Sequence, residues 1–166
     1  MDFVLDNTDM HILQLMQENA RIPNVDMAKK LDMAPSAVLE RVKKLEQRKV
    51  IRHYTTNIDP AAVEQKLLAF IFIKSTDGLG CNTTGKALAG IPEVQEVHHI
   101  AGEDCFLVKV RTADSASLIS LMRNEFASIG SIHSTKTTIV LETVKEEQKL
   151  QIPMSKKILC YWPRPA

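Results

Sequence analysis

The stretch Ala34–Lys49 has the sequence APSAVLERVKKLEQRK. Three of its apolar residues recur at helical spacing and make one short stripe, namely Val38, Val42 and Leu45. Pro35 suits the first turn of a helix, where its missing N–H costs no hydrogen bond. Cations gather on the opposite side toward the end of the stretch. The pattern predicts a helix with one face in a core and a basic outer face.

Positive charge is concentrated on this helix and just after it. Residues 39–54 carry six Lys and Arg residues and two Glu residues, whereas residues 1–28 carry five acidic residues and one Arg. The net charge of the whole chain is only +1. A local basic patch on a nearly neutral protein indicates an anionic partner.

The composition excludes several other classes of protein. At 166 residues, with 45% hydrophobic and 25% charged residues, the chain is typical of one or two globular domains. Cys81, Cys105 and Cys160 are far apart and form no metal-ligand or disulfide pattern, which fits a reducing compartment. No run approaches the roughly 18 apolar residues of a membrane span, and the N-terminus is acidic where a signal peptide is basic. We therefore expect a cytoplasmic protein with no membrane partner, metal or cofactor.

Two further helices are expected before the basic one, over Asn7–Asn19 and over Val25–Leu31 with Asn24 as its cap. The three-residue link Asp32–Ala34 then leads to Pro35. Three helices with such a link are typical of a helix-turn-helix, although an ordinary three-helix bundle is the alternative. The basic third helix and its small first residues favour binding of double-stranded DNA in the major groove.

The helix-turn-helix interpretation assigns candidate DNA contacts. Residues near the helix start and along its outer face are expected at base edges, and the later cations at phosphates. For Arg41 an internal ion pair that orients the helix is the alternative. The base-edge candidates are Ser36, Ala37, Glu40 and Lys43, the phosphate candidates are Arg41, Lys44, Arg48 and Lys49, and Pro35 opens the surface.

The second half of the chain has a different periodicity. A connecting strand is expected over Ile51–Ile58. Beyond it, strands and helices alternate in the order β-α-β-β-α-β of a ferredoxin-like sandwich. Helices cover one face of such a sheet, so the open face predicts a dimer. The expected elements are strands at Leu67–Ile73, Val94–Ile100, Phe106–Arg111 and Ser134–Thr143, and helices at Thr84–Ala89, closed by Gly90, and Ser115–Ser128.

The predicted fold is α+β, with an N-terminal helix-turn-helix (winged-helix-like) domain followed by the ferredoxin-like β-α-β-β-α-β sandwich. We expect a DNA-binding domain over residues 1–50, a linker strand over 51–65 and a ligand-sensing and dimerisation domain over 66–150. Residues 151–166 form a tail. Its segment Ile158–Trp162 is too apolar for a free tail, so we expect it to pack across a subunit boundary.

Several short motifs, taken in order, resemble the Lrp/AsnC (feast–famine) transcriptional regulators. They are Asp6-x-x-Asp9-x-x-Ile12-Leu13, Asn19-Ala20-Arg21-Ile22, Ala28-x-x-Leu31, Val38-x-x-Arg41-Val42-Lys43-Lys44-Leu45-Glu46, Val50-Ile51-x-x-Tyr54 and Gly102-Glu103-Asp104-Cys105-Phe106-Leu107-Val108-Lys109-Val110. The resemblance implies a regulator that responds to an amino acid or a similar small molecule. It also implies homodimers that assemble into tetramers or octamers, with the effector bound between dimers.

The chain departs from this family pattern at both ends of the basic helix. Ala34 stands where the family usually has Ser, so the helix lacks a hydroxyl cap worth about 1 kcal/mol. Lys49 stands where the family usually has Gly. A left-handed residue there would be strained, or the helix ends differently.

The resemblance places the effector at the turn Ala101–Asp104. Gly102 lets the backbone approach a ligand, and the carboxylate of Glu103 or Asp104 is suited to an α-ammonium group. Weaker candidates are Thr135 and Thr137. A plain hairpin with an acidic tip is the alternative, and Cys105 stands where the family pattern has Asp.

An enzyme of the siroheme-decarboxylase kind, which resembles this family in fold, is one alternative function. Cys105 with His98, His99 or His133 would be its nucleophile and base. Cys105 begins an apolar strand, however, so we expect a buried thiol and no catalytic residue. The other alternative is an amino-acid sensor that no longer binds DNA, against which the basic helix argues.

Overall fold

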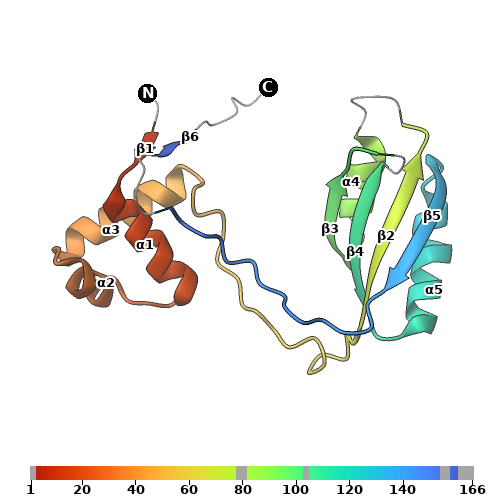
Figure 1. The fold of residues 1–166 in the computed structure, drawn as a ribbon, viewed down its shortest axis with the longest axis horizontal. Coiled ribbons are helices and arrows are strands. Elements are labelled where there is room, and N and C mark those ends of the chain that lie inside the picture. The colour runs from red at the N-terminus through yellow and green to blue at the C-terminus, as the bar shows by residue number, and fades with distance from the viewer. Residues whose placement is uncertain (1–2, 78–81, 103–104, 154–157, 161–166) are drawn as a thin grey trace. The chain divides into compact units, whose positions relative to one another are not determined.

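The computed structural model describes residues 3–77, 82–102, 105–153 and 158–160 (Figure 1). The chain divides into two compact units. The first combines residues 1–56 with residues 147–166, and the second comprises residues 57–146. The second unit is therefore inserted between two segments of the first.

Among its described residues, the first unit has three helices and a short two-stranded sheet. The helices are α1 (Asn7–Glu18), α2 (Asn24–Leu31) and α3 (Pro35–Gln47), and the strands are β1 (Phe3–Leu5) and β6 (Ile158–Cys160). The apolar stripe of α3 packs against α1 and α2, as the spacing predicts. The buried core consists of Leu5, Ile12, Met27, Ala28, Val38, Val42 and Leu45.

The turn between α2 and α3 is tight because Asp32 adopts the left-handed conformation, with φ of 52°. The N–H of Met33 donates to the Ala28 carbonyl at 3.0 Å, which closes the end of α2. The predicted cap at the start of α2 is wrong. Pro23 is the N-cap and Asn24 is already helical, because the fixed φ of Pro23 leads the chain into the helix one residue early.

Both ends of α3 bear the features expected from Ala34 and Lys49. Ala34 is the N-cap and makes no side-chain cap hydrogen bond. At the other end Lys49 is left-handed, with φ of 55°. The N–H groups of Lys49 and Val50 donate to the carbonyls of Glu46 and Leu45, each at 2.9 Å. This is a Schellman motif with a lysine at the position that glycine usually occupies.

The expected connecting strand over Ile51–Ile58 is wrong. These residues form no strand with any described part of the chain. Residue alternation indicates only that a segment suits a sheet, and a strand also needs a hydrogen-bonded neighbour.

The second unit has the predicted β-α-β-β-α-β order. Its elements are β2 (Leu67–Ser75), α4 (Thr83–Ala89), β3 (Val94–His99), β4 (Phe106–Thr112), α5 (Ser115–Asn124) and β5 (Ile132–Ile139). The antiparallel sheet has the order β3-β4-β2-β5. The ferredoxin-like prediction is confirmed.

Several boundaries in this unit differ from the expected ones, most of all those of the last strand and of the second long helix. The last strand starts at Ile132 and ends at Ile139, and the second long helix ends at Asn124 before a separate 3-10 turn over Phe126–Ser128. Gly90 closes α4, as predicted, with φ of −82°. Periodicity fixes the middle of an element better than its ends, because the terminal turns carry few core contacts.

Side chains alternate between the two faces of the sheet. Ala69, Ile71 and Ile73 of β2 are fully buried on the face that α4 and α5 cover (Figure 1). Phe70 and Phe72 point to the other face and are only half-buried. None of the described helices is long and apolar enough to span a membrane.

Candidate DNA-binding surface and effector turn

Ser36, Glu40 and Lys43 lie four and three residues apart on α3, so their side chains share one face of the helix. All three are exposed, and the core residues of α3 lie on the opposite face. Pro35 at the helix start is exposed as well. A short polar and basic face at the start of the last helix of a helix-turn-helix is the surface that enters a major groove.

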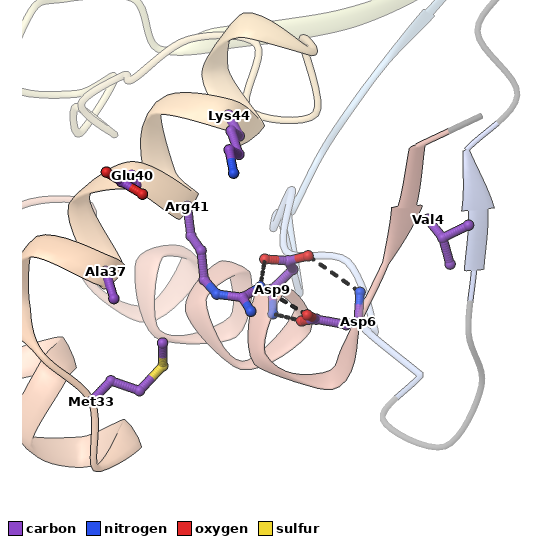
Figure 2. A pocket seen from close by; sticks show the side chains of 8 residues that line it. All are labelled: Val4, Asp6, Asp9, Met33, Ala37, Glu40, Arg41 and Lys44. Atoms are coloured by element: carbon purple, nitrogen blue, oxygen red, sulfur yellow. Dashed lines mark hydrogen bonds and ion pairs between the residues drawn. The ribbon is translucent and has the colours of Figure 1, made fainter. Parts of the chain in front are cut away.

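Arg41 is held inside the unit. Its Nη1 atom donates to Oδ1 of Asp9 at 2.7 Å and to Oδ2 of Asp6 at 2.8 Å (Figure 2). Asp6 and Asp9 also form a capping box at the start of α1, in which each carboxylate accepts the other residue's backbone N–H. The structure thus shows the internal ion pair that the sequence left open as the alternative for Arg41.

The charges in this network stabilise one another. The pKa of the Arg41 guanidinium is raised above its ordinary value, chiefly by the hydrogen bond to Asp9. Partial burial opposes ionisation of Asp6, but hydrogen bonds from the Asp9 N–H and from Arg41 outweigh it, so the pKa of Asp6 is lowered. Both shifts favour the charged forms of Arg41 and Asp6 at neutral pH.

The residues of this network line a pocket of about 410 Å³ (Figure 2). Ala37, Arg41 and Lys44 of α3 line it together with Asp6 and Asp9 of α1. Ala37 is half-buried there, whereas the other base-edge candidates are exposed. The candidate residues of α3 therefore divide between an outer face and a face toward α1.

The remaining cations of α3 and of the two residues after it reach solvent. Lys43, Lys44, Arg48 and Lys49 are all exposed. Within the described ranges no ion pair engages Lys43 or Lys44. Both ammonium groups are thus available to an external anion.

Sequence reasoning missed a contact that fixes the exit of the chain from α3. The phenol of Tyr54 donates to Oε1 of Glu46 at 2.7 Å. Partial burial and this hydrogen bond raise the pKa of Tyr54 to about 12. The sequence also contains no sign that Asp6 and Asp9 are the partners of Arg41, since their spacing indicates only a helix cap.

The described candidates for the effector site lie in the second unit, in the turn before β4 and on β5. Gly102 has φ of +146°, a conformation that favours glycine, and Ala101 beside it is exposed. Glu103 and Asp104 lie outside the described residues. Thr135 on β5 is opposite Ile73 on β2, and the N–H of Cys105 donates to the Ile73 carbonyl at 2.8 Å.

Thr135 on β5 and Cys105 at the end of the turn therefore lie on either side of Ile73 of β2. Two strand spacings separate their backbones, a distance of about 10 Å. Thr137 is exposed and lies two residues further along β5, opposite Ile71. The structure places Thr135 closer to the turn than Thr137.

A cluster of hydroxyl groups that the sequence did not predict lies next to this end of the sheet. Thr84 is fully buried, and its Oγ1 is hydrogen-bonded to the hydroxyls of Ser75, at 3.1 Å, and Ser131. The carboxylate of Asp77 accepts the N–H of Thr84 at 2.9 Å. These bonds fix the start of α4 against β2.

Cys105 and the nearby histidines are engaged in structural contacts. The Ser75 N–H donates to Sγ of Cys105 at 3.4 Å. The ring of His99 stacks on Phe106, and His98 pairs with Glu96 at 3.1 Å. Among the described residues no group of His, Cys, Asp and Glu is arranged to hold a metal ion.

Models of known protein families match segments of both units. A family model described as the AsnC-type helix-turn-helix domain matches residues 5–46. Another, described as the Lrp/AsnC ligand binding domain, matches residues 68–150. The leucine-responsive regulatory protein of Haemophilus influenzae is 33% identical over 144 residues, which cover 86% of this chain and 87% of that protein.

Solved structures of regulators superpose on the chain. A transcriptional regulator of Neisseria meningitidis in complex with L-methionine has a TM-score of 0.81 and 27% identity, covering 89% of this chain and 96% of its own. The feast or famine regulatory protein of M. tuberculosis, complexed with L-methionine, has a TM-score of 0.82 and 29% identity, covering 90% and 99%. All three relatives bear the names of regulators rather than enzymes.

Proposed function

Because this chain belongs to the Lrp/AsnC family of transcriptional regulators, we propose that it binds double-stranded DNA through α3 and alters transcription when an amino acid binds its second unit. Its site of action is then the cytoplasm, where it would meet its operator.

The observation that carries the DNA-binding proposal is the division of α3 into two faces. Ser36, Glu40 and Lys43 are presented outward for base edges. Lys44, Arg48 and Lys49 supply phosphate contacts beside them. Arg41 orients the helix, since its guanidinium already donates to two carboxylates.

The effector proposal is argued from the chemistry of the turn. Gly102 allows close approach of the backbone, and Glu103 or Asp104 is the partner of an α-ammonium group. Thr135 supplies a hydroxyl for the other end of a small zwitterion. The complexes of two structural relatives with L-methionine make that amino acid the first ligand to test.

Dimerisation through the open face of the sheet follows from its apolar residues. Phe70 and Phe72 of β2 and Leu107 of β4 lie on this face and are half-buried within one chain. A second copy would cover them by sheet-on-sheet packing. Such a dimer brings two copies of α3 to two half-sites of DNA, and dimers then assemble into tetramers or octamers with the effector between them.

The test is to map binding sites of the protein across its genome with and without amino acids, and to titrate the enriched DNA by gel shift. We expect salt-sensitive binding to those sites, and Lys43→Ala should weaken it. The matched control Lys86→Ala, which changes an exposed side chain of α4, should not. Equal binding of selected and random DNA would contradict sequence recognition. Binding that no amino acid alters, together with no change in melting temperature, would contradict the effector proposal.

A further inference from the structure

The C-terminal strand β6 belongs to the DNA-binding unit of its own chain. It pairs antiparallel with β1, with Leu5 opposite Ile158, Val4 opposite Leu159 and Phe3 opposite Cys160 (Figure 1). The prediction that Ile158–Trp162 packs across a subunit boundary stays a prediction: residues 158–160 pair with β1 of the same chain, and residues 161–162 lie outside the described residues. Both strands have only three residues.

A second contact holds the same C-terminal segment against α1. The side-chain amide of Gln17 donates to the Leu150 carbonyl at 3.1 Å, and its oxygen accepts the Leu150 N–H at 2.7 Å. Lys149 also approaches Glu18 at 3.7 Å. The C-terminal segment is therefore held near both ends of α1: β6 pairs with the strand that precedes α1, and residues 149 and 150 contact its last two residues.

β1 leads directly to the residues that hold α3. Leu5, the last residue of β1, is 6% exposed and lies in the core. The next residue, Asp6, caps α1 and accepts a hydrogen bond from Arg41 of α3. Figure 2 shows β1 and its neighbouring strand beside this network. The residue that follows β1 is therefore joined to α3 directly, by the ion pair between Asp6 and Arg41.

β1 depends on β6 for its position. Within the described residues β6 is the one strand that pairs with β1. A three-residue strand without a partner leaves its backbone donors and acceptors to water, and a two-stranded sheet is only marginally stable alone. Loss of β6 would free the backbone of Phe3 and Val4. Asp6 would then be held by the buried Leu5, by the capping box with Asp9 and by Arg41, without the support of a fixed strand before it.

We propose that β6 is a positioning element of the DNA-binding surface: by pairing with β1 it keeps Asp6 against Arg41 and so sets the orientation of α3. This rests on the proposed DNA-binding function. Neither β6 nor Arg41 contacts DNA in this scheme. Their effect on affinity passes through the direction in which Ser36, Glu40 and Lys43 are presented.

The strand pairing is tested by a disulfide. Directly opposed residues of antiparallel strands lie about 4.5–5.5 Å apart between Cα atoms, within the range of a disulfide. Phe3→Cys therefore creates a partner for the natural Cys160. We expect mild oxidation to link residues 3 and 160 within one chain, as peptide mapping and a non-reducing gel will show. The control Val4→Cys, one residue out of register, should link far less.

Two outcomes of that experiment would overturn the proposal. A link between residues 3 and 160 of different chains, seen as a covalent dimer, would mean that the strand is exchanged between subunits. Equal linking of the variant and the control would mean that the register is not formed.

The functional test compares two shortened chains. One ends at Lys157 and lacks β6, and the other ends at Trp162 and keeps β6, so both lack Arg164. We expect the chain without β6 to bind operator DNA about tenfold more weakly, a size usual for coupled neighbours. The slope of log affinity against log salt should be the same for both, because no phosphate contact is lost. Equal affinity, or a shallower slope for the chain without β6, would overturn the proposal.

The route through Asp6 is tested by combining changes. Asp6→Asn should weaken DNA binding in the chain ending at Trp162 and have little further effect in the chain ending at Lys157. Additive losses would show that β6 does not act through Asp6. If the full chain binds no DNA, the proposed function fails. The melting temperatures of the same four variants, each shortened chain with and without Asp6→Asn, would still decide whether β6 holds Asp6 in position.

Discussion

Nη1 of Arg41 lies 2.7 Å from Oδ1 of Asp9, and the Asp9 side chain is 7% exposed. This ion pair joins the middle of α3 to the first turn of α1. Because Asp9 is also part of a capping box, its carboxylate cannot turn away without breaking a backbone hydrogen bond. Arg41, for which the sequence left both a phosphate contact and an internal ion pair open, is thereby bound to two carboxylates of its own unit.

Replacing Arg41 with Gln should destabilise the first unit. The change leaves the buried carboxylate of Asp9 without its cation, and we expect the free energy of unfolding to fall by about 2 kcal/mol. Denaturant titration followed by helical circular dichroism measures this. Lys29→Gln is the control, since its pair with Asp26 is exposed and worth under about 0.5 kcal/mol. Equal losses in the two variants would contradict the structural role of Arg41.

The salt dependence of DNA binding should separate Lys44 from Arg41. If Lys44 contacts a phosphate as proposed, Lys44→Ala should make the slope of log affinity against log salt shallower by about one. Arg41→Gln should lower affinity and leave this slope unchanged. Fluorescence anisotropy at several salt concentrations gives both values. A shallower slope for Arg41→Gln would show that the arginine leaves its ion pair to contact DNA.

Lys49→Gly should stabilise the protein. Lys49 is left-handed, with φ of 55°, which costs a side chain about 1–2 kcal/mol and glycine almost nothing. After allowing for the greater freedom of glycine in the unfolded chain, we expect a gain of about 1 kcal/mol. Lys49→Ala removes the same charge but keeps the strain, so it serves as the control. A gain with alanine as large as with glycine would contradict this explanation.

Glu146→Gln should change how the stability of the second unit depends on pH. The carboxylate of Glu146 accepts hydrogen bonds from Lys109 and Arg111, and the bond from Lys109 is the main cause of its lowered pKa. A carboxyl group with a lowered pKa in the folded state stabilises above its unfolded pKa of about 4.3, and the contribution is lost as pH falls through the folded value.

We therefore expect Glu146→Gln to cost about 1 kcal/mol at pH 7, after allowance for solvent screening, and almost nothing near pH 2. Thermal unfolding between pH 2 and pH 7 measures the difference. Glu93→Gln, at an exposed position, is the control. A loss that is the same at both pH values would mean that the carboxylate charge is not what stabilises the sheet.

The sequence predicted the elements whose periodicity is strong. The stripe of Val38, Val42 and Leu45 fixed α3, and the run Leu67–Ile73 fixed β2, because one buried face dictates such spacing. The order of the second unit followed from these patterns. The strained end at Lys49 was one of the two alternatives that the sequence left open, since a left-handed cap is a local property of a few residues.

Features that depend on distant partners could not be predicted in this way. The ion pair of Arg41 with Asp6 and Asp9 joins residues more than thirty positions apart, and no local pattern reports it. The missing strand over Ile51–Ile58 and the pairing of β6 with β1 have the same cause, because a strand is defined by its neighbour. The phenol of Tyr54 and the hydroxyls around Thr84 also acquire their roles only from tertiary contacts.

The insertion of the second unit between two segments of the first has a consequence for synthesis on the ribosome. β1 and the three helices emerge early, but β6, the strand that pairs with β1, is translated after the whole sheet unit. At ordinary rates of translation β1 waits on the order of ten seconds for its neighbour. If β6 orients α3 as proposed, a newly made chain forms its three helices before it can complete the proposed DNA-binding surface.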